Sequence, residues 1–395
     1  MKDLTNLKTF IIDSDSPKEI DDAISLEKIS DNSYCLWVHI SYPCKLFSFD
    51  SEIDKEAKKK CSSIYLIDSY VPILPPDIIE KANLKENKKS ETISAGIILN
   101  KDGFIENYEI TEAVIKPNYE ITFYDANELL ELQLKEEFEL NMLNKLLIKS
   151  KKNREHKGAI NFEPNYSKII HKNNMISFEK FELTNAHNLV SEAMILMGFV
   201  ISDFMISNKI YAPFRSQKIN CDAKEILQRN SDSLVKFSIL KQYIGKSFIS
   251  TKHNKHETLG LDYYVQSTSP LRRYIDLIVQ RQISLKLNNK KCLEVSVIDE
   301  IIDYLKSRQM EINNIIRDDK NKYLKIYFNQ NIHKFFKVIF IRWINQKKNI
   351  ALVFFPDLYL ETLVSLFISI DTYPNKIYKV KYHSNNTSNL LEFIH

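Results

Sequence analysis

Glycine is scarce in this chain, which has only 6 glycines among its 395 residues. An average protein has about 7% glycine, several-fold more. The two glycine-rich patterns that cradle phosphates, G-x-G-x-x-G and G-x-x-x-x-G-K, are both absent. Any phosphate group that binds here must therefore be held by side chains, helix ends or a metal ion.

Closely spaced cysteines and membrane-length apolar runs are also missing. The five cysteines are widely spaced, with no C-x-x-C pair, which argues against a zinc cluster and indicates a reducing compartment. No uninterrupted apolar run approaches the roughly 20 residues that cross a bilayer. The N-terminus, MKDLTNLKTF, has neither the apolar segment nor the cleavage pattern of a secretory signal. We expect a soluble protein that acts where it is made and has no membrane partner.

The composition is that of an ordinary globular protein, with 44% hydrophobic residues and a net charge of +4. This charge does not by itself demand a nucleic-acid partner. Two basic runs, KKK at 58–60 and KSKKNREHK at 149–157, could follow a phosphate backbone. Most such runs are solvated faces, and we favour that interpretation. The richness in Lys, Asn and Ile indicates AT-biased coding.

The order of patterns along the chain predicts an α+β protein with two domains. Residues up to about 122 alternate like strands, and the tail from about 332 consists of short β-type runs. The tail has the size of a small oligonucleotide-binding (OB) barrel. We predict a catalytic domain over 1–325 and a barrel over 332–395. Helical spacing is found at 124–154, 185–208, 222–242, 270–288 and 296–325.

The stretch FIIDSDSPKEIDD at 10–22 is unusually acidic. Carboxylates this close raise one another's pKa unless a cation or a set of donors compensates. A solvated turn is one interpretation, because Asp, Ser and Pro are ordinary turn residues. A divalent-metal site is the other, and it requires a bend, because Asp21 and Asp22 would point to opposite faces of a regular strand.

A second stretch, STSPLRRYIDLIVQRQ at 267–282, predicts a helix capped by Thr268 or Ser269, with Pro270 as its first residue. Arg272 and Arg273 would then lie in the first turn, where the helix dipole favours an anion. The alternative is an ordinary ion pair between Arg272 and Asp276. We favour an anion site, since a guanidinium fork at a helix start can bind phosphate oxygens.

The two stretches together predict a chemistry. Carboxylates that hold Mg²⁺ and an arginine that holds a phosphate are the parts needed to hydrolyse a phosphodiester.

At this level of detail the sequence resembles the ribonuclease II/ribonuclease R (RNB) family of 3′-to-5′ exoribonucleases. The resemblance covers about residues 8–290 and implies an RNB-type catalytic domain, β-sheets with packed helices, followed by an OB-like barrel. The chain looks like a short form, without the cold-shock barrels that precede this domain in bacterial members. The matching stretches, in the family's order, are IDSDSPKEIDDAISLE, WVHIS, DKEAKKKCSSIYLIDSYVPILPPDII, NLVSEAMIL and YYVQSTSPLRRYIDLIVQR.

The resemblance assigns roles to individual residues. Glu19 falls on a metal-site position where the family usually has Asp, and Asp15 falls outside the set, which leaves it a turn residue. For Tyr65 and Phe162, assigned to the RNA 3′ end and to a terminal base, core packing is the alternative. The implied metal ligands are Asp13, Glu19, Asp21 and Asp22. The implied catalytic residues are Asp21, Asp22 and Arg272, and the implied RNA-binding residues are Tyr65, Phe162, Arg272 and Arg273.

Three other positions depart from the family pattern. Ser191 stands beside Glu192 where a second acid is usual, Ser267 replaces a Phe, and Gln280 replaces a His. Without cold-shock barrels we expect a weaker and more salt-sensitive hold on RNA, because fewer phosphates are neutralised.

The resemblance implies a monomeric, Mg²⁺-dependent exoribonuclease that degrades single-stranded RNA to nucleoside 5′-monophosphates. Two alternatives stay open: an RNA-binding protein of the same fold with weakened or lost catalysis, and a Ca²⁺-type structural site in a protein that is not a nuclease. The coding bias favours a plastid-encoded protein of the plastid stroma, and a bacterial cytoplasm is the alternative location.

Overall fold

The computed structural model of the chain describes residues 1–395 except 162–165, 221, 231–232, 368–371, 384–390 and 395. The helices are α1 (Glu52–Lys60), α2 (Pro76–Ala82), α3 (Phe123–Leu132), α4 (Phe138–His156), α5 (Asn185–Ser207), α6 (Ala223–Arg229), α7 (Lys236–Leu240), α8 (Tyr274–Leu287) and α9 (Val295–Gln330). The strands before the tail are β1 (Lys2–Asp3), β2 (Thr9–Asp13), β3 (Asp22–Lys28), β4 (Ser33–Ser41), β5 (Ile64–Tyr65), β6 (Tyr70–Val71), β7 (Ser90–Asn100), β8 (Ile105–Ile115), β9 (Tyr119–Thr122), β10 (Ser167–Lys172), β11 (Met175–Lys180), β12 (Phe214–Ser216) and β13 (Phe248–Ser250).

The largest sheet confirms the β-rich N-terminal part. Its strand order is β1-β8-β7-β4-β3-β2-β9, with parallel pairs only at its two edges, β1 with β8 and β2 with β9. Side chains of a strand alternate between the two faces of a sheet. Leu36 and Val38 of β4 therefore enter the main core, whereas Cys35 and Trp37 enter a smaller cluster on the opposite face.

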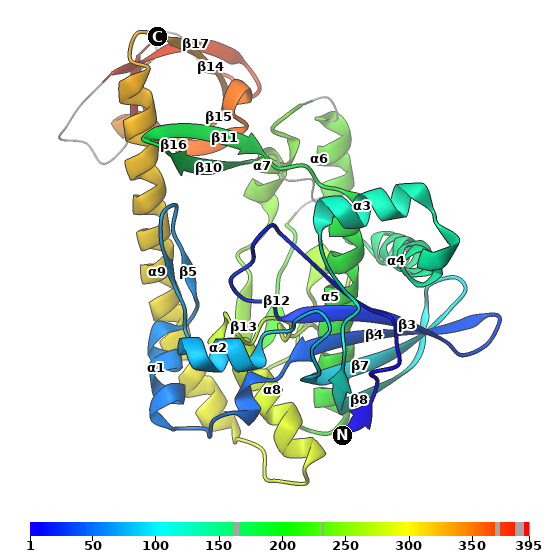
Figure 1. Cartoon of the computed structure of the whole chain (residues 1–395). Helices are drawn as coiled ribbons and strands as arrows, with labels where there is room; N and C mark the ends of the chain where they lie inside the picture. Colours follow the sequence, from blue (N-terminus) through cyan, green and yellow to red (C-terminus); the bar gives the residue numbers. More distant parts are fainter. Residues whose placement is uncertain (162–165, 221, 231–232, 368–371, 384–390, 395) are drawn as a thin grey trace.

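Helices α3, α4, α5 and α8 cover the main-core face of this sheet (Figure 1). The helix α5 begins at the cap Thr184, whose side chain accepts a hydrogen bond from the backbone N–H of His187. Its buried residues lie on most of its sides, as the sequence predicted. The strand β3, which carries the end of the acidic stretch, is thus held from both sides by packed apolar residues.

One of the few glycines lies where α5 meets another segment. A Cβ atom added at Gly198 would lie 2.6 Å from the carbonyl oxygen of Val265 and 2.3 Å from the ring of Tyr264. We expect Gly198→Ala to lower the free energy of unfolding by about 1–3 kcal/mol, since the helix and this backbone must separate. Urea unfolding followed by circular dichroism measures the change, and an unchanged midpoint would contradict the close packing.

Three predicted helices differ from the observed ones. The helix α8 begins at Tyr274, with Arg273 as its N-cap, and not at Pro270. The segment before it forms a turn in which the backbone N–H groups of Arg272 and Arg273 donate to the carbonyl oxygen of Ser269. The predicted helices at 124–154 and 222–242 are each divided, into α3 with α4 and into α6 with α7.

The tail forms a closed five-stranded barrel, as expected. Its strand order, β14-β15-β16-β18-β17, is that of an OB-type barrel. Figure 1 shows α9 running along one side of the molecule to the barrel, and its residues Leu324 and Phe328 are part of the barrel core. The barrel strands are β14 (Phe335–Asn345), β15 (Ile350–Phe355), β16 (Leu360–Phe367), β17 (Ile377–His383) and β18 (Leu391–Ile394).

By length and composition alone, α5 would be able to cross a membrane. In the described structure, 56% of its most apolar window is buried inside the protein. The core helix of a soluble protein passes the same test, so this feature is weak support for a membrane span.

Candidate metal and phosphate site

The acidic stretch lies between two neighbouring strands, as predicted. Asp13 is the last residue of β2 and Asp22 is the first residue of β3, so the loop between them turns back on itself. Ser16 has a positive φ of 53° in this loop, next to the exposed Asp15. Asp15 only accepts a hydrogen bond from Ser16, which is consistent with a turn residue.

Asp21 is fixed by two segments that are far apart in the sequence. Its Oδ1 atom accepts from the backbone N–H of Leu271 at 2.9 Å and from the hydroxyl of Ser41 at 3.2 Å. Its Oδ2 atom is buried, has no hydrogen-bond partner among the described residues, and lies 3.6 Å from Nε of Arg272. One carboxylate oxygen is thus anchored, and the other is left for a cation.

Burial and mutual repulsion determine the electrostatics of this cluster. Burial raises the pKa of Asp21 to about 8, Arg272 opposes the rise, and Asp22 and Glu19 add to it. Burial, followed by the charge of Asp13, raises the pKa of Asp22 to about 7. The structure therefore brings Asp13, Glu19, Asp21 and Asp22 close enough to interact, and the cluster is short of positive charge.

Glu19 is held by hydroxyl groups. Its carboxylate accepts from the hydroxyl of Ser63 at 2.7 Å and from the hydroxyl of Tyr65. Both donors lie in the segment that follows α1. These two bonds hold the carboxylate of Glu19 against the segment that carries Ser63 and Tyr65.

The residues fit a divalent metal by chemistry. The four acids supply hard carboxylate oxygens, which Mg²⁺ prefers, and the partnerless Oδ2 of Asp21 is available as a ligand. No group of three or more His, Cys, Asp or Glu side chains among the described residues is arranged so that it could hold a metal ion. The donor set is thus present, but its carboxylates are not gathered around one point, and that of Glu19 is bonded to Ser63 and Tyr65.

The two neighbouring arginines point to different partners. Arg272 lies next to Asp21, and although burial opposes it, the charges of Asp21 and Asp22 raise its pKa. The guanidinium of Arg273 donates instead to Asp276 at 2.6 Å. The alternative pair of Arg272 with Asp276 is therefore wrong, because Arg272 lies in the turn before α8, whereas Asp276 lies in the first turn of that helix and pairs with Arg273.

Other predicted residues have different surroundings. Tyr65 is 44% exposed beside the cluster. Phe162 lies outside the described residues. Glu192 is buried in an ion pair with Arg154, which donates from Nε at 2.9 Å, and it accepts from Ser150 as well. The weakened acidic pair at Ser191 and Glu192 thus forms a structural link between α4 and α5.

His39 has no access to the cluster. Its two ring nitrogens bond to the hydroxyls of Ser25 and Ser94, each at 2.8 Å, and burial lowers its pKa to about 3. It is a neutral core residue that links β3, β4 and β7.

Gln280, in place of the usual His, supports the site from behind. Its Nε2 atom donates to the carbonyl oxygen of Ser41 at 2.6 Å, and the hydroxyl of Ser41 donates to Asp21. Sequence reasoning missed Ser41, Ser63 and the backbone N–H of Leu271. Nothing local marks them, because each lies far in sequence from the acid that it holds.

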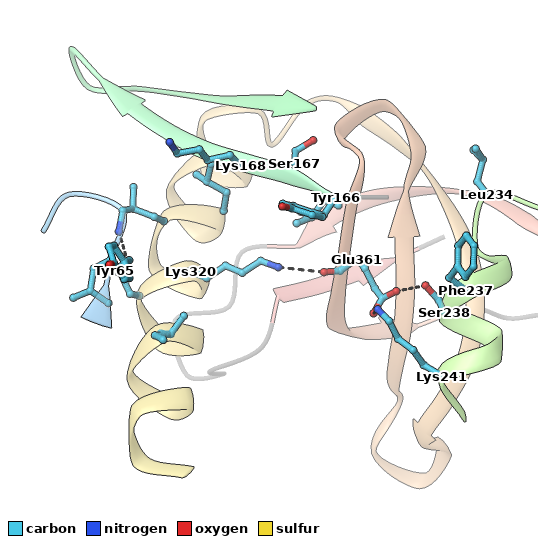
Figure 2. Close-up of a pocket in the computed structure, with 16 residues that line it drawn as sticks. Tyr65, Tyr166, Ser167, Lys168, Leu234, Phe237, Ser238, Lys241, Lys320 and Glu361 are labelled. Atoms are coloured by element: carbon cyan, nitrogen blue, oxygen red, sulfur yellow. Dashed lines mark hydrogen bonds and ion pairs between the residues drawn. The ribbon is translucent and has the colours of Figure 1, made fainter. Parts of the chain in front are cut away.

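A cavity of about 680 Å³ extends from Tyr65 to the barrel. Figure 2 shows the aromatic rings of Tyr65, Tyr166 and Phe237 around it, with lysines from several elements. The half-buried Lys320 of α9 donates to the backbone carbonyl of Glu361 in β16 at 3.2 Å, and this bond joins α9 to the barrel. Lys168 and Lys241 also line the cavity. The cavity is thus lined by aromatic rings, by three lysines and by the acids Asp319 and Glu361, and Tyr65, which donates to Glu19, connects it to the acidic cluster.

The raised pKa of Asp21 predicts a pH effect on stability. A carboxylate whose folded pKa is about 8, against an ordinary value of 3.8, costs stability as the pH rises through this window. Asn has no such charge, so we expect metal-free Asp21→Asn to melt about 2 °C or more above the wild type at pH 8. Thermal melts in EDTA should show the difference shrinking towards pH 5. Equal melting points across the whole range would contradict the raised pKa.

Comparisons with known proteins agree with this fold. An RNB domain profile matches residues 1–289. An uncharacterized ribonuclease of Synechocystis is 29% identical over 364 residues, which cover 91% of this chain and 54% of that protein. Ribonuclease II, chloroplastic/mitochondrial, of Arabidopsis thaliana is 31% identical over 291 residues, covering 71% of this chain and 36% of that protein. The chain therefore spans about half or less of the length of these relatives.

Two solved structures show the same fold. The apo form of Mycoplasma genitalium RNase R has a TM-score of 0.87 at 21% identity, covering 100% of this chain and 71% of that one. Yeast Ssd1, described as a pseudonuclease, has a TM-score of 0.68 at 14% identity, covering 92% of this chain and 50% of that one. At these identities the likeness shows the fold alone.

Proposed function

The chain belongs to the RNB-domain family, and on this basis we propose that it is a Mg²⁺-dependent exoribonuclease that removes nucleotides from the 3′ end of single-stranded RNA. The observation that carries the proposal is the cluster of Asp13, Glu19, Asp21 and Asp22 beside Arg272, in which Glu19 and Asp21 are buried and the other two acids are half-buried. Such a cluster is costly without a cation, and a site of this kind is found where phosphoryl groups are processed.

In this proposal each group has a role in one hydrolysis. A water oxygen bonds to the phosphorus, the bond from phosphorus to the 3′ oxygen breaks, and the released nucleotide keeps the phosphate as a 5′-monophosphate. The four acids would hold Mg²⁺, which when bound would supply positive charge for the water and the leaving oxygen. Arg272 holds the phosphate, since its side chain is 48% exposed while Asp21 is buried.

The RNA would approach through the cavity between Tyr65 and the barrel. Bases can stack on exposed rings without regard to sequence, and Tyr65 and Tyr166 are both 44% exposed. Phe162 and Arg273 complete the set of RNA-binding residues that the sequence predicts. Arg273 is the less direct of the two arginines, because its guanidinium is paired with Asp276.

A charge reversal in this cavity tests the RNA path. Lys168 is exposed and lines the cavity, so Lys168→Glu should weaken RNA binding several-fold and reduce the salt slope by about 1. The control is Lys290→Glu, the same change on an exposed lysine outside the cavity. Fluorescence anisotropy of labelled RNA at several salt concentrations measures both. Equal effects of the two changes would argue against this path.

A second candidate function is an RNA-binding protein that has lost turnover. Two observations favour it: the carboxylate of Glu19 is tied to Ser63 and Tyr65, and the same fold occurs in a pseudonuclease. The retained acids and Arg272 favour the enzyme.

The direction and product of the reaction test the leading proposal. RNA labelled at its 3′ end should release a labelled nucleoside 5′-monophosphate at once, whereas 5′-labelled RNA should release it last. Thin-layer chromatography identifies the product. Release of long labelled fragments would show internal cleavage and overturn the proposal.

The remaining features of the proposal rest on sequence. We propose a monomer in the plastid stroma, with a bacterial cytoplasm as the alternative. The Arabidopsis relative is named chloroplastic/mitochondrial, which is compatible with the first location.

A further inference from the structure

A second cavity, of about 600 Å³, lies on the other side of the arginine pair. It is formed between the turn before α8, the short strands β12 and β13, and the middle of α9. Its volume is within the range of roughly 300–1,000 Å³ that is usual for small-molecule sites. The residues that carry the argument are Ser62, Arg215, Phe248, Arg273, Lys306 and Met310.

This cavity and the acidic cluster share a wall. Ser62 pairs with Arg273 in an antiparallel bridge, and the backbone N–H of Ser63 donates to the carbonyl oxygen of Arg272 at 2.9 Å. Successive side chains of extended segments point to opposite sides. Ser63 and Arg272 therefore face the acids, which they contact through Glu19 and Asp21. Ser62 and Arg273 face the second cavity.

The cavity has an excess of positive charge. Arg215, Arg273 and Lys306 line it, and no acidic side chain does so among the described residues. The Nε atom of Arg273 is buried and has no hydrogen-bond partner among the residues that the structure describes. Arg215 donates to the hydroxyl of Ser247 at 2.9 Å, and burial and the nearby charge of Arg273 lower its pKa. Arg273 is already ion-paired with Asp276 at 2.6 Å, so its unused Nε donor and the N–H groups of Arg215 are what an anion with several oxygens would meet.

The opposite part of the cavity is apolar and open. Phe248 is 44% exposed and Met310 is 59% exposed, and both line it. The amides of Gln266 and Gln309 also line the cavity, and an amide can bond to the edge of a heterocycle; that of Gln309 already donates to Asn313 at 3.1 Å. An exposed ring near guanidiniums is the combination that binds a base and its phosphate together.

We infer that this cavity binds a nucleoside 5′-monophosphate, with its phosphate on Arg215 and Arg273 and its base against Phe248. The inference stands on the lining residues and does not depend on RNA hydrolysis. If the proposed function holds, the ligand is the product of the reaction. The paired segments at Ser62 and Arg273 then separate its site from the acidic cluster.

AMP binding to the full chain tests this inference. The protein is Asp22→Asn in EDTA, which removes the metal and turnover from the measurement, and isothermal titration calorimetry gives the affinity. AMP should bind saturably at one site, and adenosine should bind at least about tenfold more weakly because it lacks the phosphate. Phe248→Ala and Lys306→Glu, both at exposed positions, should each weaken AMP about fivefold or more. Lys290→Glu, with the same charge change outside the cavity, should leave the affinity unchanged.

Three results would overturn the inference: no saturable binding of AMP, equal binding of AMP and adenosine, or AMP binding that both cavity variants leave intact. AMP binding that both variants leave intact would show that AMP binds at another site, for example at the acidic cluster. Circular dichroism confirms that the variants are folded. AMP binding without any RNA hydrolysis would sink the proposed function and leave this inference standing, and RNA hydrolysis without AMP binding would do the reverse.

Discussion

Asp22→Asn reduces the rate of RNA shortening by about 10³-fold or more and leaves the affinity for RNA within about threefold. Asp22 is the first residue of β3, fully within the acidic cluster, and its charge repels that of Asp13. Loss of this carboxylate removes a proposed metal ligand but no lysine or aromatic residue from the proposed RNA path. Single-turnover kinetics with excess enzyme separate the chemical step from binding.

Asp15→Asn is the matched control for this change. It removes the same charge from the same loop, but Asp15 is exposed and contacts only Ser16. We expect it to keep a rate within about twofold of the wild type, since exposed charges interact weakly. An equal loss from Asp15→Asn and Asp22→Asn would show that the loop acts by its total charge and not as a site.

Glu19→Asp increases the rate by about tenfold or more, because misplacement of a reacting group by about 1 Å can cost on the order of 10²-fold. In the wild type, the longer side chain reaches Ser63 and Tyr65, which bind both of its oxygens. The shorter Asp cannot extend as far and is expected to stay with the other three acids.

Tyr65→Phe tests whether the hydrogen bonds of Glu19, and not only the length of its side chain, determine the rate. It removes one of the two donors that hold Glu19 and keeps the aromatic ring. We expect a smaller gain of rate than for Glu19→Asp, measured on the same RNA. A loss of rate in both variants would mean that Glu19 acts where the structure places it, and that its contacts with Ser63 and Tyr65 are part of the working site.

The sequence was informative where the signal is local. The acidic loop and its bend could be predicted because Asp13, Glu19, Asp21 and Asp22 fall within ten positions after an apolar strand. The barrel could be predicted from alternation in short runs. The helix α5 could be predicted because its apolar residues recur on most sides.

The sequence misled where long-range contacts decide the local structure. Pro270 looks like the first residue of a helix, but the backbone N–H of Leu271 donates to Asp21 and that of Ser269 donates to Asp276. These bonds hold the segment as a turn, so that α8 begins only at Tyr274. The same turn separates Arg272 from Arg273, which local spacing had placed together at one anion.

Both cavities were also beyond the reach of the sequence. The passage to the barrel joins the hairpin at Tyr65 to α9 and β16, which lie about 250 to 300 positions later in the chain. The second cavity brings Arg215 to Arg273, which lies 58 positions later in the chain. A periodic pattern within a short stretch of sequence cannot predict contacts between residues that lie so far apart in the chain.

Digestion of 5′-labelled single-stranded RNA with Mg²⁺ is the most direct test of the central claim, that the acidic cluster beside Arg272 hydrolyses RNA from its 3′ end. The wild type should give a ladder of progressively shorter products, and the ladder should disappear both in EDTA and with Asp21→Asn. RNA that is bound but never shortened by the wild type would contradict the claim and leave an RNA-binding protein of this fold.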